Sequence, residues 1–571
     1  MLFFVSLLES ILASHALQLA LKITVRNPLT VVFFAGFFLL CLHAGNPWKK
    51  SPVPALVASS ALSIIIVYLI KIRVTSGFDS GLFKVASLLI SFLGFSFGIY
   101  VIIKSIFSLK RGTFAKSVQM PELPGKYVKN ENTVFFLTAI LYFLICIPFF
   151  LYEFPGIMTA DSIVQYEQII GERPFSNHHP VIHTLLVGFF YNIGLFTTGD
   201  KNAAIAFYTV FQMIFMSICC GLCVREVIRV SSSKKRIYAV LSFLFYVLLA
   251  FNPVFTVTLW KDVIFAGVSA LLFICLMEMK RNAKRTDFIW FSILALLFAL
   301  LRSNAFYAII VFCPFMLIIY KERIKECLIS CLLVIAVVLL VKGPVFTAFS
   351  VEKPDTAESL SVPLQQIARV LVNDRELDEN ELALIDAAID RTYIKELYAP
   401  DYADNIKELL RAGDQNAISS NKMAYFRLWA DIGLKYPKDY IDAWYDLTGG
   451  YIYPDFSYAV GDVDGIMNND YGLKWLPKIG GKAVVKGKEI FIKLGSFIPV
   501  YGMFFAAGAY TWALVISFIA ALKNKRNVSV HILLILLTGT LLIASPVVDF
   551  RYVYALVFSF PLWMAISFRK E

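Results

Sequence analysis

The sequence predicts an all-α polytopic membrane protein. Its residues are 58% hydrophobic and 16% charged, whereas a soluble domain is about 45–50% apolar and about 25% charged. Many separate runs of about 20 apolar residues are each long enough to cross the hydrocarbon layer as a helix. The net charge of +12 resides in short basic patches between these runs. Such patches set topology and contact anionic lipid, so they do not indicate nucleic-acid binding.

The apolar runs predict about 13–14 transmembrane helices. The first run lacks a basic region and a clear cleavage site, so we interpret it as a retained helix rather than a signal peptide. It is a weak span because it carries Glu9 and His15, and the second run is short. The expected spans are 2–21, 28–43, 53–72, 84–106, 133–152, 203–223, 237–252, 262–279, 287–301, 304–320, 325–342, 497–522, 529–545 and 548–567.

Basic loops give the orientation, because Lys and Arg accumulate in short cytoplasmic loops. The loops 110–129 and 225–236 are basic and are placed inside, which allows one crossing between residues 180 and 224. The run 180–194 has about 15 residues, short of the 20 or so that a span needs. We therefore expect it to be an interfacial helix on the outer side, beginning at Pro180 and ending at Gly194. The remaining basic loops, also inside, are 280–285, 321–325, 523–526 and 569–570.

This topology places the polar segments of the chain on the outer face. The longest of them, 343–490, is helical by periodicity over 379–411 and then becomes rich in Tyr, Trp, Gly and Asp, which predicts a small, mainly α domain with an irregular aromatic end. The expected domains are N-terminal transmembrane helices (1–130), a transmembrane core (131–342) with an outer loop (153–202), an extracytoplasmic domain (343–490) and C-terminal transmembrane helices (491–571).

Asp161 stands out in the outer loop. The pair Ser162 and Gln165 is typical of a capping box that opens a helix running to Gly171, which would put Asp161 just before the positive end of that helix. One interpretation is a simple helix-start acid. The other is a general base that takes a proton from an attacking hydroxyl. Asp161 and Gln165 then share one face of the loop.

Neither histidines nor cysteines predict a metal centre. His178, His179 and His183 lie close together, but no Cys joins them and adjacent side chains point in different directions, so substrate hydrogen bonding or a plain interfacial loop is favoured over zinc. The nine Cys lie in or beside apolar runs, which argues against a disulfide framework or a thiolate zinc site. Four acidic residues could bind a divalent cation, namely Asp455, Asp462, Asp464 and Asp470. Their spacing is not that of an EF-hand, so no cofactor is assigned.

Basic residues also occur at the outer ends of three separate spans. Lys261 and Asp262 follow Trp260, Arg302 and Asn304 share a second turn, and Asp549 and Arg551 begin the last span. Each pair alone is typical of an interfacial anchor. Charges that enter a membrane are usually paired or functional, however. Lys261, Arg302 and Arg551 together are typical of a cationic clamp on one anion, and a lipid-borne phosphate is the anion expected at that depth.

Several blocks, in this order, resemble the GT-C superfamily of membrane glycosyltransferases, and most closely an uncharacterised bacterial group near its mannosyltransferase and aminoarabinose-transferase branch. The resemblance spans about residues 130–560, and Ser162 stands where the mannosyltransferase pattern has a second acid. It implies a polyprenyl-phosphate-linked sugar donor, a cell-envelope glycan or lipid acceptor, an outward-facing site in the bacterial plasma membrane, and Asp161 as the catalytic base. The blocks are PGIMTADSIVQYEQ, HHPVIHTLL, LWKDVIFAG, LRSNAFY, VPLQQIARV and SPVVDFRY.

The sequence therefore predicts a glycosyltransferase, with a transporter or lipid flippase as the rival class and a membrane scaffold as a third. A transporter would show two related halves with paired broken helices, which the sequence lacks. The residues expected to bind substrate around Asp161 are Gln165, His178, His179, Lys261, Asp262, Arg302, Asn304 and Arg551.

Overall fold

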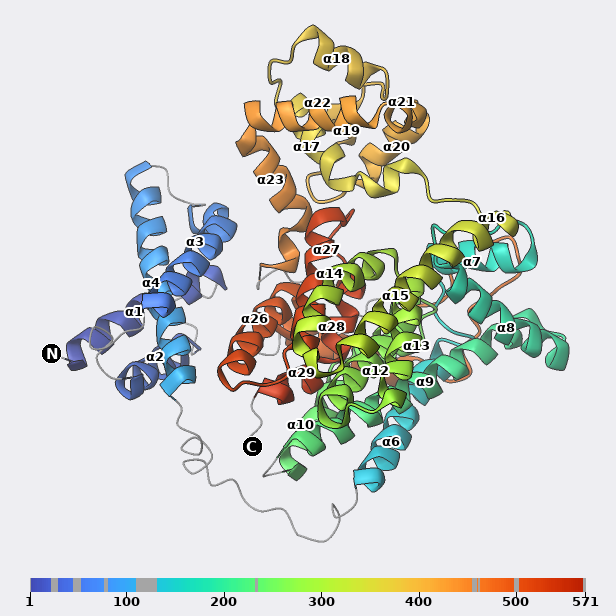
Figure 1. Cartoon of the computed structure of the whole chain (residues 1–571), viewed down its shortest axis with the longest axis horizontal. Coiled ribbons are helices and arrows are strands. Elements are labelled where there is room, and N and C mark those ends of the chain that lie inside the picture. The colour runs from blue at the N-terminus through green and yellow to red at the C-terminus, as the bar shows by residue number, and fades with distance from the viewer. Residues whose placement is uncertain are drawn as a thin grey trace. The chain divides into compact units, whose positions relative to one another are not determined.

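The computed structural model describes most of the chain (Figure 1). Within the described residues, the secondary structure consists of helices and isolated β-bridges, which confirms the all-α prediction. The expected basic loop 110–129, part of loop 225–236, residues 569–570, Asp455 and Asp462 lie outside them. The described ranges are 2–21, 29–44, 53–75, 81–108, 131–231, 235–453, 460, 463–497 and 503–567.

Seven described helices are long and apolar enough to cross a membrane, or eight if the bent pair Phe550–Phe558 and Phe560–Ser567 forms one span. The chain is thus a helical membrane protein, as predicted. The count is lower than the expected 13–14 or so because five further apolar helices have only 10–17 residues, and a perpendicular crossing takes about 20. The seven are α3 (Val53–Thr75), α4 (Gly81–Ser108), α6 (Glu131–Tyr152), α8 (Val181–Thr198), α9 (Lys201–Val230), α12 (Lys261–Asn282) and the stretch Lys321–Ala348.

The chain divides into two compact units, Met1–Leu123 and Pro124–Glu571. In the first unit, α1 (Leu2–Ala20), α2 (Leu29–Ala44), α3 and α4 pack on one another. A Cβ atom at Gly94 of α4 would lie 2.2 Å from the carbonyl oxygen of Leu12. The missing side chain therefore lets α1 and α4 approach backbone to backbone, as small residues do between membrane helices. Whether α1 spans the membrane stays a prediction.

The second unit is organised around α12, in which 89% of the residues of the membrane-length stretch are buried. It contacts α9, α13, α27 and α28 (Figure 1). At its C-terminal end, Arg281 pairs with Glu226 of α9 at 2.9 Å, and Glu226 also accepts from Arg229 at 2.8 Å. Other helices of this part are α10 (Lys235–Leu248), α11 (Phe251–Thr256), α13 (Arg285–Leu301), α14 (Ser303–Ile319), α15 (Ile324–Leu340), α24 (Lys482–Phe497), α26 (Ala507–Lys523), α27 (Ser529–Ala544), α28 (Tyr554–Phe558) and α29 (Phe560–Ser567).

Helix α8 is longer than predicted. It begins after Pro180, as expected, but it continues past Gly194 and ends at Gly199, which has φ 67°. Gly194 serves packing instead, because a Cβ atom there would lie 2.6 Å from the Cα atom of Ala204 in α9. The start of α8 contacts Tyr208 in α9 through His183, and its end precedes α9 directly. Both ends thus lie beside the first turns of α9; the interfacial orientation stays a prediction.

Segment 343–490, which the basic loops predict to lie outside, contains a second, smaller apolar core. The predicted helix over 379–411 is three short helices, since the chain turns at Asp390, which accepts from the backbone N–H of Thr392, and again near Pro400. Trp444 docks this part on α27 by donating to the carbonyl of Leu542 at 2.7 Å. Its main helices are α17 (Ser361–Val372), α18 (Glu379–Asp386), α19 (Ile394–Leu397), α20 (Asp404–Ala412), α21 (Gln415–Ser420), α22 (Lys422–Lys435) and α23 (Pro437–Thr448).

The topology can be tested by cysteine labelling on whole cells. Cysteines replacing the exposed residues Glu172, Asn416 and Asp470 should react with an impermeant thiol reagent, because the basic loops put these segments outside. Cysteines at positions 115 and 232 should react only after the cells are opened. External labelling at 232 would show that α8 crosses the membrane and that the orientation is wrong.

Candidate functional site

Asp161 lies in the first turn of α7 (Ala160–Ile170), and not before the helix as predicted. The N-cap is Thr159, and the proposed capping box is absent because the hydroxyl of Ser162 donates to the carbonyl of Leu259 at 2.9 Å. The helix ends at Gly171 with φ 82°, as expected. The side chain of Asp161 therefore remains near the positive end of the helix, where a carboxylate is favoured.

Backbone bonds fix the position of Asp161 relative to α12. The N–H of Ile157 donates to Val257 and the N–H of Leu259 donates back to Ile157, at 2.9 and 3.0 Å. The indole of Trp260 adds a 2.9 Å bond to the hydroxyl of Thr159. Because Leu259 and Trp260 directly precede Lys261, these bonds bring the first turns of α7 and α12 together.

The carboxylate of Asp161 is shared by two cations. Nη1 of Arg551 donates to Oδ2 of Asp161 at 2.9 Å, and Nζ of Lys261 lies 3.6 Å from the same oxygen. Arg551 also pairs with Asp549, at 2.7 Å between Nε and Oδ2. Nζ of Lys261 also lies 3.1 Å from Nδ1 of His179, and a protonated Lys261 donates to this nitrogen.

A second ion pair lies beside the first. Nη1 of Arg302 is 2.7 Å from Oδ1 of Asp262, whose side chain is 1% exposed. The guanidinium groups of Arg302 and Arg551 both lie over the ring of Tyr552, at 4.8 and 5.1 Å from its centroid. The three predicted clamp cations therefore do gather at one place, since Tyr552 joins Arg302 to the Asp161 group. We call these six charged residues the outer ionic cluster, after the outer side that the basic loops predict for them: Asp161, Lys261, Asp262, Arg302, Asp549 and Arg551.

The cluster is electrically balanced, with three basic and three acidic side chains. Burial by itself would raise the pKa of Asp161, but the charges of Lys261 and Arg551 outweigh burial and lower that pKa below its usual range. Burial, helped by the charge of Lys261, lowers the pKa of His179 and keeps its imidazole neutral. Asp161 is therefore an ionised, weakly basic carboxylate in this arrangement.

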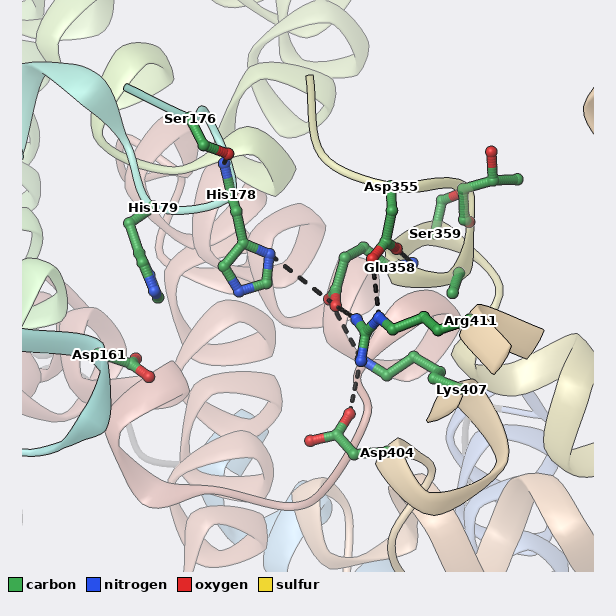
Figure 2. Close-up of polar contacts among 12 residues, drawn as sticks. Asp161, Ser176, His178, His179, Asp355, Glu358, Ser359, Asp404, Lys407 and Arg411 are labelled. Atoms are coloured by element: carbon green, nitrogen blue, oxygen red, sulfur yellow. Dashed lines mark hydrogen bonds and ion pairs between the residues drawn. The ribbon is translucent and has the colours of Figure 1, made fainter. Parts of the chain in front are cut away.

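The adjacent histidines serve different partners. Figure 2 shows the ring of His179 facing the carboxylate of Asp161, whereas the ring of His178 turns toward Glu358. Nδ1 of His178 is 3.8 Å from Oε1 of Glu358, and the same oxygen accepts from Arg411. The other oxygen of Glu358, Oε2, accepts from Lys407 at 3.1 Å. His178 thus connects the outer loop to the outer domain, and does not reach the outer ionic cluster.

Two other predicted residues also lie apart from the cluster. Nε2 of Gln165 donates to the hydroxyl of Thr184 at 2.9 Å, and Oε1 of Gln165 accepts from Nδ1 of His183 at 3.1 Å, which holds α7 against α8. Asn304 donates to the hydroxyl of Thr540 at 2.9 Å and joins α14 to α27. Their helical spacing placed them near Asp161 and Arg302, but it did not reveal these partners.

No group of three or more His, Cys, Asp or Glu side chains within the described part of the chain is arranged to hold a metal ion. Asp464, one of the acids considered for a divalent cation, pairs with Lys488 instead. Sequence reasoning did not single out Lys342, which donates to Ser303 at 3.5 Å, beside Arg302. Its signal is a lone Lys before Gly343 and Pro344 at the end of an apolar run, where the helix takes a π-helical turn.

The fold and the cluster define a multi-spanning helical membrane protein with paired charges gathered at the ends of its core helices. The chain belongs to a family of unknown function (DUF6020), which matches residues 170–571. That match includes Lys261, Arg302 and Arg551 and begins after Asp161. No curated protein and no solved structure matches the chain.

The Arg302–Asp262 pair gives a prediction about stability. Arg302→Ala should lower the free energy of unfolding by about 3–5 kcal/mol, because it leaves a buried carboxylate without its partner. Thermal unfolding of the purified protein in detergent measures this change. The exposed Arg427→Ala serves as the control and should change stability by about 0.5 kcal/mol or less.

The double variant Arg302→Ala/Asp262→Ala should be more stable than Arg302→Ala, because residues in contact do not act additively. A double variant that loses the sum of both single effects would contradict a direct pairing.

Proposed function

We propose that this protein is a GT-C-type glycosyltransferase that moves a sugar from a polyprenyl-phosphate donor to an extracytoplasmic cell-envelope acceptor. The observation that carries the proposal is the shared carboxylate of Asp161, held by cations from the ends of two other segments, Lys261 and Arg551. A base beside cations is what a sugar transfer from a lipid phosphate needs. The order of sequence blocks that resemble GT-C enzymes supports the same class.

The proposed reaction is a displacement at the anomeric carbon. The acceptor hydroxyl oxygen forms a bond to that carbon while the bond from carbon to the phosphate oxygen breaks. The hydroxyl proton passes to the carboxylate of Asp161, and the electron pair of the broken bond leaves with the lipid phosphate. Lys261 and Arg551 stabilise the charge of that phosphate. No acid is required, because the leaving group is already anionic.

The resting ion pairs imply that the donor prepares the base. A phosphate that takes hydrogen bonds from Arg551 and Lys261 competes with Asp161 for both cations. Its arrival removes the interactions that lower the pKa of Asp161, so the carboxylate becomes a stronger base once the donor is bound. Arg551 suits this exchange because its planar group binds phosphate or carboxylate through two parallel bonds.

Asp161→Asn should abolish turnover while donor binding persists. A general base typically contributes about 10²–10⁴-fold, and removal of the carboxylate leaves Lys261 and Arg551 free for the phosphate. A strain that lacks the gene should accumulate the lipid-linked donor, which identifies the substrate for the assay. The rate of donor consumption in membranes then compares the variant with wild type at equal protein level. Turnover near wild type would remove Asp161 from the mechanism.

Lys261→Ala and Arg551→Ala should each raise the half-saturating donor concentration about tenfold or more, because a hydrogen bond to a charged group contributes about 1.5–3 kcal/mol. Arg551→Lys keeps the charge but loses the paired bonds, so it should be only partly active. The double variant Lys261→Ala/Arg551→Ala should raise the half-saturating donor concentration by less than the product of the two single increases. Arg427→Ala is the control, and donor dependence that stays unchanged in all four site variants would leave these cations as anchors.

The rival function is a transporter or lipid flippase, and one observation favours it. The last helices bend by 48° between Phe558 and Phe560, and broken helices form the substrate sites of many transporters. Such a transporter has a matching break in a related half of the chain, and among the described residues one bent pair meets the membrane-span test. Movement of a labelled lipid across proteoliposomes, without any sugar transfer, would favour the rival.

A further inference from the structure

A basic and apolar segment lies between the outer domain and the C-terminal helices. Four exposed lysines recur at every fourth position of this segment, and no acidic residue occurs among them. Three large apolar side chains of the same segment are between 36% and 41% exposed. We call residues 474–486 the lysine strip; its lysines are Lys474, Lys478, Lys482 and Lys486, and its exposed apolar side chains are Trp475, Leu476 and Ile479.

The lysine strip is attached to the end of a membrane-length helix. The backbone N–H groups of Leu476 and Lys478 donate to the carbonyls of Phe154 and Leu151 at 2.8 and 2.7 Å. The indole of Trp475 donates to the carbonyl of Tyr152, the last residue of α6, at 2.8 Å. α6 has 22 residues, enough to cross the membrane. A strip bound to the end of a helix that spans the membrane would lie where the hydrocarbon layer meets water.

The charges of the strip have no acidic partner within the described residues. The nearby Lys488 pairs with Asp464, but none of the four strip lysines forms an ion pair in the described part of the chain. Lys478 instead lies over the ring of Phe154, at 4.4 Å from its centroid. The strip therefore presents four positive charges beside apolar side chains, and it complements a surface that is anionic on top and apolar beneath.

Topology does not explain these lysines. Positive residues beside a span normally mark its cytoplasmic end, yet the strip is bound to the end of α6 that precedes Glu153 and leads to Asp161. The other end, at Glu131, pairs with Arg229 at 2.8 Å. Four lysines on the predicted outer side thus oppose the usual charge bias, which indicates that they serve binding.

We propose that the lysine strip binds the headgroups of anionic phospholipids at the outer surface of the membrane that the protein spans. The lysines contact the headgroup phosphates, while the indole of Trp475 and the side chains of Leu476 and Ile479 enter the interface. A soluble anionic polymer would match the lysines but would give the apolar side chains no contact. The inference does not depend on the proposed sugar transfer, since it concerns a different segment and a different ligand.

The test uses the full-length protein with an environment-sensitive fluorophore at Gly480→Cys. A side chain fits there, because no atom lies within 4 Å of a Cβ placed at Gly480. The label is titrated with short-chain phosphatidylglycerol and with short-chain phosphatidylcholine. We expect half-saturation by phosphatidylglycerol at a concentration about tenfold lower or more, and a weaker preference at high salt.

Matched variants separate charge from fold. Changing all four strip lysines to Gln should abolish the preference, whereas changing them to Arg should retain it. The control carries four Lys→Gln changes on exposed positions elsewhere, and it should behave as wild type; these are Lys353, Lys395, Lys422 and Lys438. Equal half-saturation by both lipids, equal loss in the control, or displacement of phosphatidylglycerol by soluble polyglycerol phosphate would each overturn the proposal.

Discussion

The sharing of the Asp161 carboxylate between Lys261 and Arg551 is the interaction on which the meeting point of α7, α12 and the C-terminal helices depends. Arg551 lies 390 residues from Asp161 in sequence, so this contact closes the C-terminal helices onto α7. Burying a single charge near a membrane is costly, and pairing offsets that cost. The three segment ends are therefore held together by one set of paired charges.

The same principle operates at the opposite end of the core. Helix α12 begins with Lys261 and Asp262 in the outer ionic cluster, and near its other end Arg281 pairs with Glu226. Twenty residues of helix separate Lys261 from Arg281, which corresponds to about 30 Å at 1.5 Å per residue. That is about the thickness of the hydrocarbon layer. The two ionic groups are thus spaced as the two boundaries of a membrane, and the residues between them are almost all buried apolar side chains.

Composition alone predicted the helical membrane fold, because apolar runs of span length leave few other structures. Repeated charges at span ends also predicted which cations gather, since buried charges need partners. Sequence spacing could not supply the partners themselves. Gln165 and Asn304 were assigned to the site by their position in the sequence. In the structure Gln165 bonds to His183 and Asn304 bonds to Thr540 instead. The roles predicted for Ser162 and Gly194 were wrong for a related reason. Ser162 bonds to the carbonyl of Leu259 and does not cap α7, and Gly194 packs against Ala204 and does not end α8.

The neutrality of the outer ionic cluster has a consequence for any anion that binds it. Three cations that faced three carboxylates before binding must release at least one carboxylate in order to hold a phosphate. The released group gains basicity at the moment the anion arrives. In the proposed reaction this couples the two substrates in order, because Asp161 becomes a useful base only after the donor occupies Lys261 and Arg551. A carboxylate that is weakly basic before the donor binds therefore fits a base that the donor itself activates.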